Sequence, residues 1–186
     1  MMEYEKKILL TEEEYIALLN HFQKVSLVKQ INYYFDTDDL SMNKRGITCR
    51  IRYKNGTYKA TVKKHKTNIQ DCSEETVIGS ASELVEDVFT SMGLKLQGNL
   101  VTNRTVILKQ NAYIVMLDKN DYLGHADYEL EIEYISSCEK YATQLIWDIA
   151  SILISSGKLS NIENFFDRMQ NTKSKSQRFF ERKHLG

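Results

Sequence analysis

Polar and apolar residues alternate along several short stretches of this chain, a period of two that is typical of β-strands. Residues 46–54 are the clearest case, with apolar side chains on one face and polar or basic side chains on the other. Asn55-Gly56 follows, a dipeptide that strongly favours a tight turn. Residues 57–64 resume the alternation, so the two stretches are predicted to form a hairpin. The polar faces of this hairpin carry four basic residues: Arg50, Arg52, Lys59 and Lys63.

The same pattern predicts further strands along the rest of the chain. Turns between them rest on Gly, Asn, Asp and Ser, because the sequence has no proline. A polar or short helical turn is expected at 38–44 and a polar loop at 65–71. The further strands are predicted at 3–9, 29–37, 72–78, 99–109, 111–119 and 126–135.

Apolar residues at helical spacing predict three amphipathic helices, each opened by a capping-box sequence. A shorter helix and a basic, aromatic tail follow them. The first helix covers roughly 12–23, the second runs from the Ser80–Glu83 box to Gly93, and the third runs from the Ser136–Glu139 box to near Gly157. The short helix is expected near 161–169, and the tail covers 173–185.

About eight strands with local connections imply antiparallel pairing, and helices inserted between strands imply an α+β fold. No internal repeat divides the chain, so residues 1–186 are predicted to form a single domain. Each amphipathic helix needs an apolar sheet face to cover. If the sheet closes into a barrel, the opposite, charged faces turn inward. The prediction is a closed eight-stranded antiparallel barrel with a charged interior, covered by helices.

The overall charge of the chain argues against a general attraction to polyanions such as nucleic acid or membrane surfaces. Lys and Arg number 25 and Asp and Glu number 25, so the formal net charge is zero. A balanced chain has no general attraction to nucleic acid or membrane, and any charged ligand must be held by a local cluster. The three cysteines show no CxxC spacing, which indicates reduced thiols. No secretory signal or membrane-length apolar run is present, so a soluble, cytoplasmic protein is expected.

Acidic and basic residues gather on different predicted strands. Any one alternating strand is most simply a solvated face over a core face. As a set, however, the acids cluster on the first and last strands and the bases on the hairpin between them. Lys and Arg bind phosphate oxygens, whereas carboxylates bind hard cations such as Mg²⁺ or Mn²⁺ that bridge to phosphate. Such a cluster therefore favours metal-assisted phosphate chemistry.

The order of the motifs resembles the CYTH domain family of triphosphate tunnel metalloenzymes. Glu3-x-Glu5-x-Lys7 matches the family's ExExK signature. The later motifs follow in sequence: Tyr34-Phe35-Asp36-Thr37, Arg50-Ile51-Arg52, Thr61-Val62-Lys63, the Glu-x-Glu run at 129–133, and the basic tail from Lys173 to Arg178. The resemblance covers nearly the whole chain. It implies an eight-stranded tunnel that binds a triphosphate with divalent metal, in a family that includes triphosphatases and a class of adenylate cyclases.

The resemblance also implies roles for individual residues. Catalytic roles fall on Glu3, Glu5, Lys7 and Glu131. The metal ligands would be Glu3, Glu5 and Glu131, with Glu129 and Glu133 as further candidates. The phosphate contacts would be Lys7, Arg50, Arg52, Lys63, Arg104 and a terminal lysine, with Lys59 a weaker candidate. Glu75 and Asp118 would order the basic residues or hold a second metal. The terminal lysine is expected to be Lys175, with Lys173 as the alternative.

Other residues have simpler explanations. No Walker A, GxSxG or HExxH motif occurs, and the four histidines form no cluster. His21 is expected on the first helix, His65 and His125 in loops, and His184 in the tail. Phe165, Phe166, Phe179 and Phe180 are interpreted as core or dimer contacts, which leaves a homodimer open. The basic tail is interpreted as a solvated helical face with one residue over the tunnel rather than as a nucleic-acid patch.

The leading functional prediction is a metal-dependent triphosphatase. Inorganic triphosphate is the default substrate, with an organic triphosphate such as thiamine triphosphate as the other choice, because no pocket for a base or a thiazole ring is evident. One alternative is a cyclase that makes cyclic AMP and pyrophosphate from ATP with the same residues. The other is a non-catalytic sensor of polyphosphate or a phosphorylated ligand, for which basic residues alone would suffice.

Overall fold

The computed structural model describes residues 2–65 and 72–185, and the predicted loop at 65–71 lies almost wholly outside them. Within these residues, eight strands form a closed barrel in the order β1-β5-β4-β3-β2-β6-β7-β8. Every neighbouring pair is antiparallel, which confirms the predicted barrel. The strands are β1 (Met2–Leu10), β2 (Ser26–Asp36), β3 (Ile47–Lys54), β4 (Thr57–His65), β5 (Cys72–Ala81), β6 (Lys95–Lys109), β7 (Tyr113–Tyr122) and β8 (His125–Tyr134).

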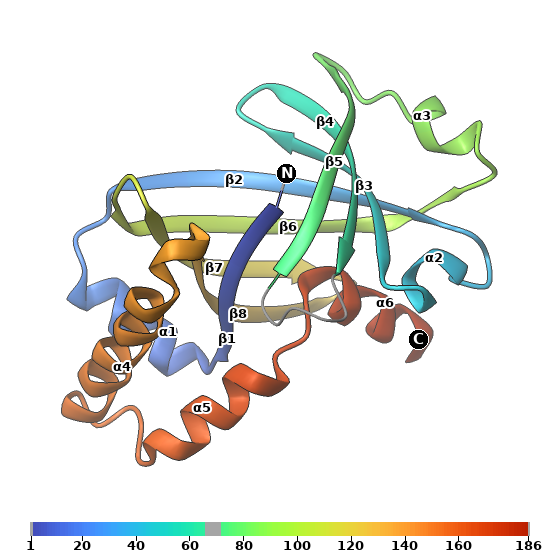
Figure 1. The fold of residues 1–186 in the computed structure, drawn as a ribbon. Coiled ribbons are helices and arrows are strands. Elements are labelled where there is room, and N and C mark those ends of the chain that lie inside the picture. The colour runs from blue at the N-terminus through green and yellow to red at the C-terminus, as the bar shows by residue number, and fades with distance from the viewer. Residues whose placement is uncertain (1, 66–71, 186) are drawn as a thin grey trace.

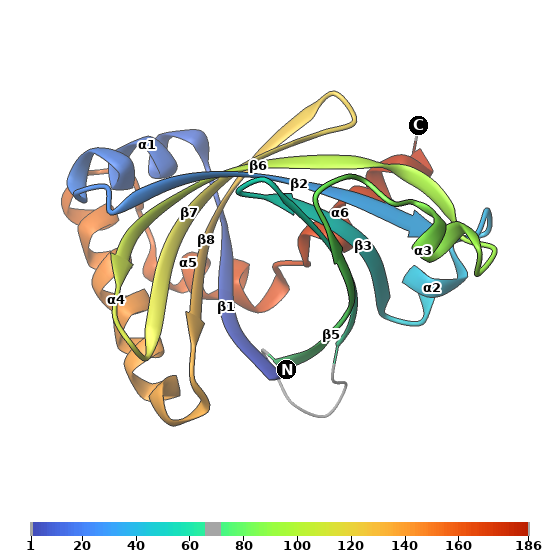
Figure 2. The same ribbon diagram turned by 90° about the horizontal axis from the view of Figure 1, so that it is seen from above.

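Helices cover one flank of this barrel, as the apolar strand faces require. α1, α4 and α5 pack there against β1 and β8, with α1 and α4 together on one side (Figures 1 and 2). Their shared core includes Leu18, Ile132, Ile146 and Phe165, none of which is exposed. The helices are α1 (Glu12–His21), α2 (Ser41–Lys44), α3 (Asp87–Thr90), α4 (Glu139–Ser155), α5 (Ile162–Asn171) and α6 (Lys175–Leu185).

One of the three predicted capping boxes is confirmed and two are wrong. Thr11 and Glu14 cap α1 reciprocally. Ser80 instead lies in β5, paired with Lys59, and the predicted helix from Ser80 to Gly93 shrinks to the four residues of α3. Because β5 pairs with β4 here, the backbone N–H and C=O groups near Ser80 are used in the sheet and are not available for helical hydrogen bonds. Ser136 begins a 3₁₀ turn, and α4 starts only at Glu139, without a side-chain cap.

The tail is a helix with an exposed end at 181–185 and Lys175 at the cavity, as predicted, but the expectation that Arg178 is solvated is wrong. α6 buries Arg178, Phe179 and Phe180. The Phe179 ring lies 4.9 Å from the ring of Tyr34 on β2. Together with Leu100 and Tyr122 these aromatic residues form a separate small core. With Phe165, three of the four phenylalanines interpreted as core or dimer contacts are therefore core residues, and α6 lies against one end of the barrel (Figure 1).

Gly98 on β6 makes the close approach of α6 possible. Its φ angle is +140°, and a Cβ built there would lie 3.0 Å from Cζ of Phe179. We expect Gly98→Ala to lower the free energy of unfolding by about 1–3 kcal/mol, through backbone strain and overpacking. Urea denaturation measures this change.

Gly79 on β5 provides the matched control. A Cβ at Gly79 meets no atom within 4 Å. Gly79→Ala should leave stability unchanged or raise it by up to about 1 kcal/mol, because alanine reduces the freedom of the unfolded chain. Equal losses in the two variants would contradict this account of Gly98.

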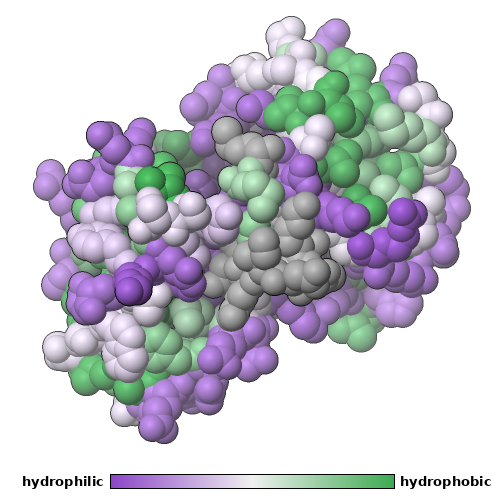
Figure 3. Space-filling view, in the orientation of Figure 1, coloured by the Kyte–Doolittle hydropathy of each residue, from purple (hydrophilic) through white to green (hydrophobic). Residues whose placement is uncertain are grey.

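The surface in the orientation of Figure 3 is mostly hydrophilic, with a group of exposed apolar side chains. Hydrophilic residues cover much of the face shown in Figure 3, and apolar residues gather between β5 and α3. The exposed apolar side chains near there include Val77, Ile78 and Val85. None of the helices in the described part of the chain is both long and apolar enough to cross a membrane.

Candidate active site

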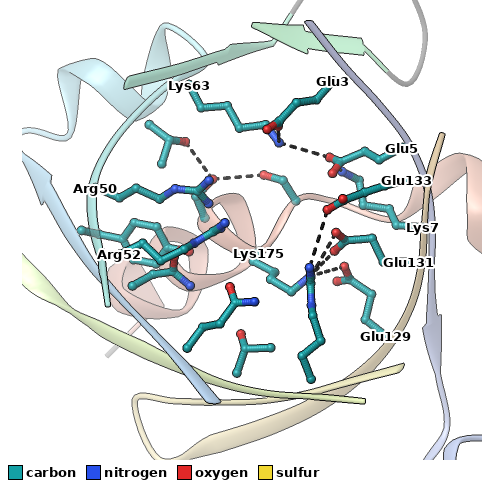
Figure 4. A pocket seen from close by; sticks show the side chains of 18 residues that line it. Glu3, Glu5, Lys7, Arg50, Arg52, Lys63, Glu129, Glu131, Glu133 and Lys175 are labelled. Atoms are coloured by element: carbon teal, nitrogen blue, oxygen red, sulfur yellow. Dashed lines mark hydrogen bonds and ion pairs between the residues drawn. The ribbon is translucent and has the colours of Figure 1, made fainter. Parts of the chain in front are cut away.

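The charged strand faces turn into the barrel and line one cavity. The strand order places β3 four steps from β8 in either direction, so the basic and acidic strands stand on opposite walls. Figure 4 shows Arg50 and Arg52 on one side and the glutamates of β8 on the other. The charged lining residues are Glu3, Glu5, Lys7, Arg50, Arg52, Lys63, Arg104, Glu129, Glu131, Glu133 and Lys175.

Three buried carboxylates converge on the acidic wall. Asp118, Glu129 and Glu131 each offer an oxygen, and these oxygens lie within 4.8 Å of one another. The ammonium of Lys175 sits among them, 2.5 Å from both glutamates and 3.0 Å from Asp118. Lys173 instead pairs with exposed Glu181. Of the two tail lysines that the sequence offered, Lys175 is therefore the one in the cavity.

The electrostatics of this wall differ from residue to residue. Burial favours a raised pKa for Glu131, but Arg104 and Lys175 outweigh it and hold that pKa well below its usual range. Burial also opposes ionisation of Glu5, yet Lys7 and Lys63 lower its pKa to about 2. Glu133 has less compensation, so burial and the nearby Glu131 raise its pKa to about 7. Cations therefore keep Glu131 and Glu5 charged, whereas the charge of Glu133 is compensated less.

Most basic residues of the cavity are already paired with acids. Arg104 donates two hydrogen bonds to Asp118, at 2.9 and 2.7 Å, and a third to Glu131 at 3.0 Å. Arg50 forms a close ion pair with Glu75. Asp118 and Glu75 thus order the basic residues, as one of their two predicted roles required.

The N-terminal motif lies along β1, and Lys63 of β4 contacts both of its glutamates, Glu5 at 3.6 Å. Lys63 pairs with Glu3 at 3.0 Å, and Lys7 pairs with Glu5 at 2.6 Å. Glu3 therefore lies with a base of β4 rather than in the buried acid cluster. Lys59, the weaker candidate, is exposed and is not among the residues that line the cavity.

Arg52 differs from the other arginines. Among the described residues no carboxylate lies within ion-pair distance of it. Its Nε donates to Oδ1 of Asn32 at 2.8 Å. Burial, together with Arg50 and Arg104, lowers the pKa of its guanidinium to about 10. An anion that binds beside this buried guanidinium would therefore stabilise its charged form.

Several cavity residues were not predicted. Gln30, Asn32 and Thr102 form an uncharged polar part of the wall. Arg178 of α6, which does not itself line the cavity, supports the acidic wall at 2.9 Å from Asp127 and 2.5 Å from Glu129. Two sequence signals were available: the alternation of positions 30, 32 and 34, and the three-residue spacing that puts Lys175 and Arg178 on one helix face.

The donor set fits a hard divalent cation. Carboxylate oxygens are the ligands that Mg²⁺ and Mn²⁺ prefer, and three of them already converge. Glu5 and Glu133 line the cavity beside this cluster and offer further carboxylate oxygens. The cluster includes Asp118, for which the sequence left open either a role in ordering the basic residues or a second metal, and it does not include Glu3.

Comparisons with known proteins agree with this geometry. A family model of the CYTH domain matches residues 1–161. YjbK of Bacillus subtilis, provisionally described as a triphosphatase, is 31% identical over 147 residues, covering 71% of this chain and 77% of its own.

Solved structures are similar as well. One from Bacillus halodurans, provisionally described as an adenylate cyclase, superposes with a TM-score of 0.65 at 28% identity, covering 96% of this chain and 97% of that one. HpAC1 from Hippeastrum, described as having a dominant triphosphatase activity, gives a TM-score of 0.58 at 17% identity, covering 87% and 98%. At that identity the second likeness concerns the fold alone.

Proposed function

The chain belongs to the CYTH domain family, and from that premise we propose that it is a divalent-metal-dependent triphosphatase. The observation that carries the proposal is the pair of opposed walls within one cavity. On one wall, Arg52 has no ion-pair partner among the described residues, and on the other, buried carboxylates converge. Inorganic triphosphate is the default substrate, with an organic triphosphate such as thiamine triphosphate as the second choice.

The basic wall supplies binding and charge neutralisation. A triphosphate carries several negative charges, and guanidinium groups can each hold two of its oxygens. Arg50 and Arg52 point into the cavity from adjacent inward positions of β3, and Lys63 points inward from β4. Because these groups are fixed by the strands before substrate arrives, they can stabilise charge that develops on phosphate oxygens during cleavage.

The acidic wall supplies the metal-binding role. Asp118, Glu129 and Glu131 would hold the cation in the place that the Lys175 ammonium fills in this structure, with Glu5 and Glu133 as neighbouring ligands. When bound, Mg²⁺ or Mn²⁺ polarises phosphoryl oxygens and lowers the pKa of a coordinated water. Lys175 keeps these carboxylates close together and, with Ser176, brings α6 to the cavity. Ser176 hydrogen-bonds Thr48 of β3 at 2.9 Å, which secures α6 across the barrel.

Adenylate cyclase activity is the second candidate, because the Bacillus halodurans relative carries that provisional description. A cyclase must also hold a nucleobase. Tyr34 is the one aromatic side chain among the described lining residues, and it already packs against Phe179. A purely binding role is less well supported, since anion binding would not require the convergent carboxylates.

A substrate panel tests the proposal. Purified protein is incubated with tripolyphosphate, thiamine triphosphate or ATP, each with Mg²⁺, with Mn²⁺ or with EDTA. Orthophosphate, pyrophosphate and cyclic nucleotide are measured separately. We expect orthophosphate from at least one triphosphate, only with metal present. Cyclic AMP plus pyrophosphate from ATP would favour the cyclase, and no product with any substrate would favour the binding role.

A further inference from the structure

Gln30 of β2 is a buried amide whose nitrogen has no hydrogen-bond partner in the part of the chain that the structure describes. Its side chain lines the cavity and the residue is only 2% exposed. Its Nε2 has no partner among the described residues. Buried amide groups are nearly always hydrogen-bonded, because an unpaired buried donor is costly. An orphan donor that faces a cavity therefore points to an acceptor that the ligand supplies.

The strand register places Gln30 between two arginines. It pairs with Lys54 on β3 and with Thr102 on β6. The next inward position on β3 is Arg52, and the next on β6 is Arg104. Donors from three adjacent strands thus face the same part of the cavity.

The polar neighbours of Gln30 are already engaged. Thr102 donates its hydroxyl to Asn120 at 2.8 Å. Asn32 accepts from Arg52 through its Oδ1, also at 2.8 Å. The cations on both sides exclude a positively charged partner and favour an anionic oxygen.

We propose that Gln30 is a substrate-binding residue whose side-chain amide donates a hydrogen bond to a phosphate oxygen held by Arg52. This inference rests on the proposed function and adds a contact to it. An amide adds no charge and cannot change protonation near neutral pH. Gln30 therefore recognises the position of an oxygen rather than the total charge of the ligand.

The test uses Gln30→Met, which keeps the length and volume of the side chain and removes the donor. Binding of the nonhydrolysable imido analogue of tripolyphosphate is measured by calorimetry with Mg²⁺. We expect the dissociation constant to rise about 10- to 100-fold, as for loss of a hydrogen bond to a charged group. The melting temperature of the unliganded variant should be unchanged or higher, because an unpaired buried amide has been removed.

Two further variants make the outcome decisive. Gln144→Met, on the exposed surface of α4, should bind as the wild type does. Gln30→Glu keeps the shape but places a carboxylate beside Arg52, so binding should weaken by more than about 100-fold through repulsion and competition.

Each alternative result has a distinct meaning. If the wild type binds and both Gln30 variants bind equally well, the inference is wrong while the proposed function stands. If the wild type binds no triphosphate analogue, the proposed function fails and the inference fails with it. If Gln30→Met lowers the melting temperature without weakening binding, Gln30 has a structural role only.

Discussion

Arg52→Met is expected to weaken binding of the imido analogue of tripolyphosphate by about 100-fold or more. A guanidinium that holds phosphate through two charge-assisted hydrogen bonds contributes an effect of this order. Within the described chain Arg52 has no ion pair to lose, and its pKa is lowered to about 10 by burial and by Arg50 and Arg104. The unliganded variant should therefore lose little stability, no more than about 1–2 kcal/mol for the hydrogen bond to Asn32.

A loss of affinity without a comparable loss of stability distinguishes a residue that binds ligand from one that supports the fold. Calorimetric titration with Mg²⁺ gives the affinity, and a thermal melt without ligand gives the stability. Arg45→Met is the matched control, because Arg45 is exposed at the end of α2. Equal affinity in Arg52→Met and the control would remove the central phosphate contact from the account.

Arg178→Met should lower the free energy of unfolding by about 3–5 kcal/mol, because it removes the cation of a buried ion-pair network and leaves the carboxylates without it. Asp127 and Glu129 would lose the partner that lies 2.9 and 2.5 Å away. For a chain of this size such a loss corresponds to a fall in melting temperature of roughly 10 °C or more. Differential scanning calorimetry measures it directly.

Lys173→Met is the corresponding control on the same tail. The Lys173 ion pair with Glu181 is exposed, with side-chain exposures of 56% and 52%. An exposed pair contributes about 0–1 kcal/mol, so the melting temperature should barely move. Similar melting temperatures for Arg178→Met and the wild type would show that α6 is not held by this network.

The charged interior could be predicted because it depends on alternation, which the sequence displays directly. Once the sheet closes, the period of two sends Arg50 and Arg52 to the same interior as Glu129 and Glu131. No contact between these residues had to be known. Closure was favoured by the need of each amphipathic helix for an apolar face, and the closed eight-stranded tunnel was implied by the resemblance of the ordered motifs to the CYTH family.

The part played by α6 could not be predicted in the same way. Its basic and aromatic residues are equally compatible with a solvated helix, and the partners of Arg178 lie 49 and 51 positions away in the sequence. Such long-range pairing leaves no local pattern. Ser80 failed for a related reason, because a local capping sequence was overridden by pairing with β4.

Gln30 shows a third limit of sequence reasoning. It shares its strand face with Asn32 and Tyr34, so alternation alone could place it in the interior. A neutral amide, however, carries no sign of ligand binding. Its significance comes only from its orphan nitrogen and from the arginines on both neighbouring strands.

The most direct test of the central claim follows tripolyphosphate by ³¹P nuclear magnetic resonance with the wild-type protein and with Glu131→Gln. Glu131 belongs to the converging carboxylate cluster, and the substitution removes a charged ligand with little change of shape. With Mg²⁺ or Mn²⁺, the account predicts that the wild type forms orthophosphate and pyrophosphate in equal amounts. EDTA or Glu131→Gln should reduce this rate by at least about 100-fold. Cleavage that persists unchanged in EDTA, or no cleavage by the wild type with either metal, would contradict it.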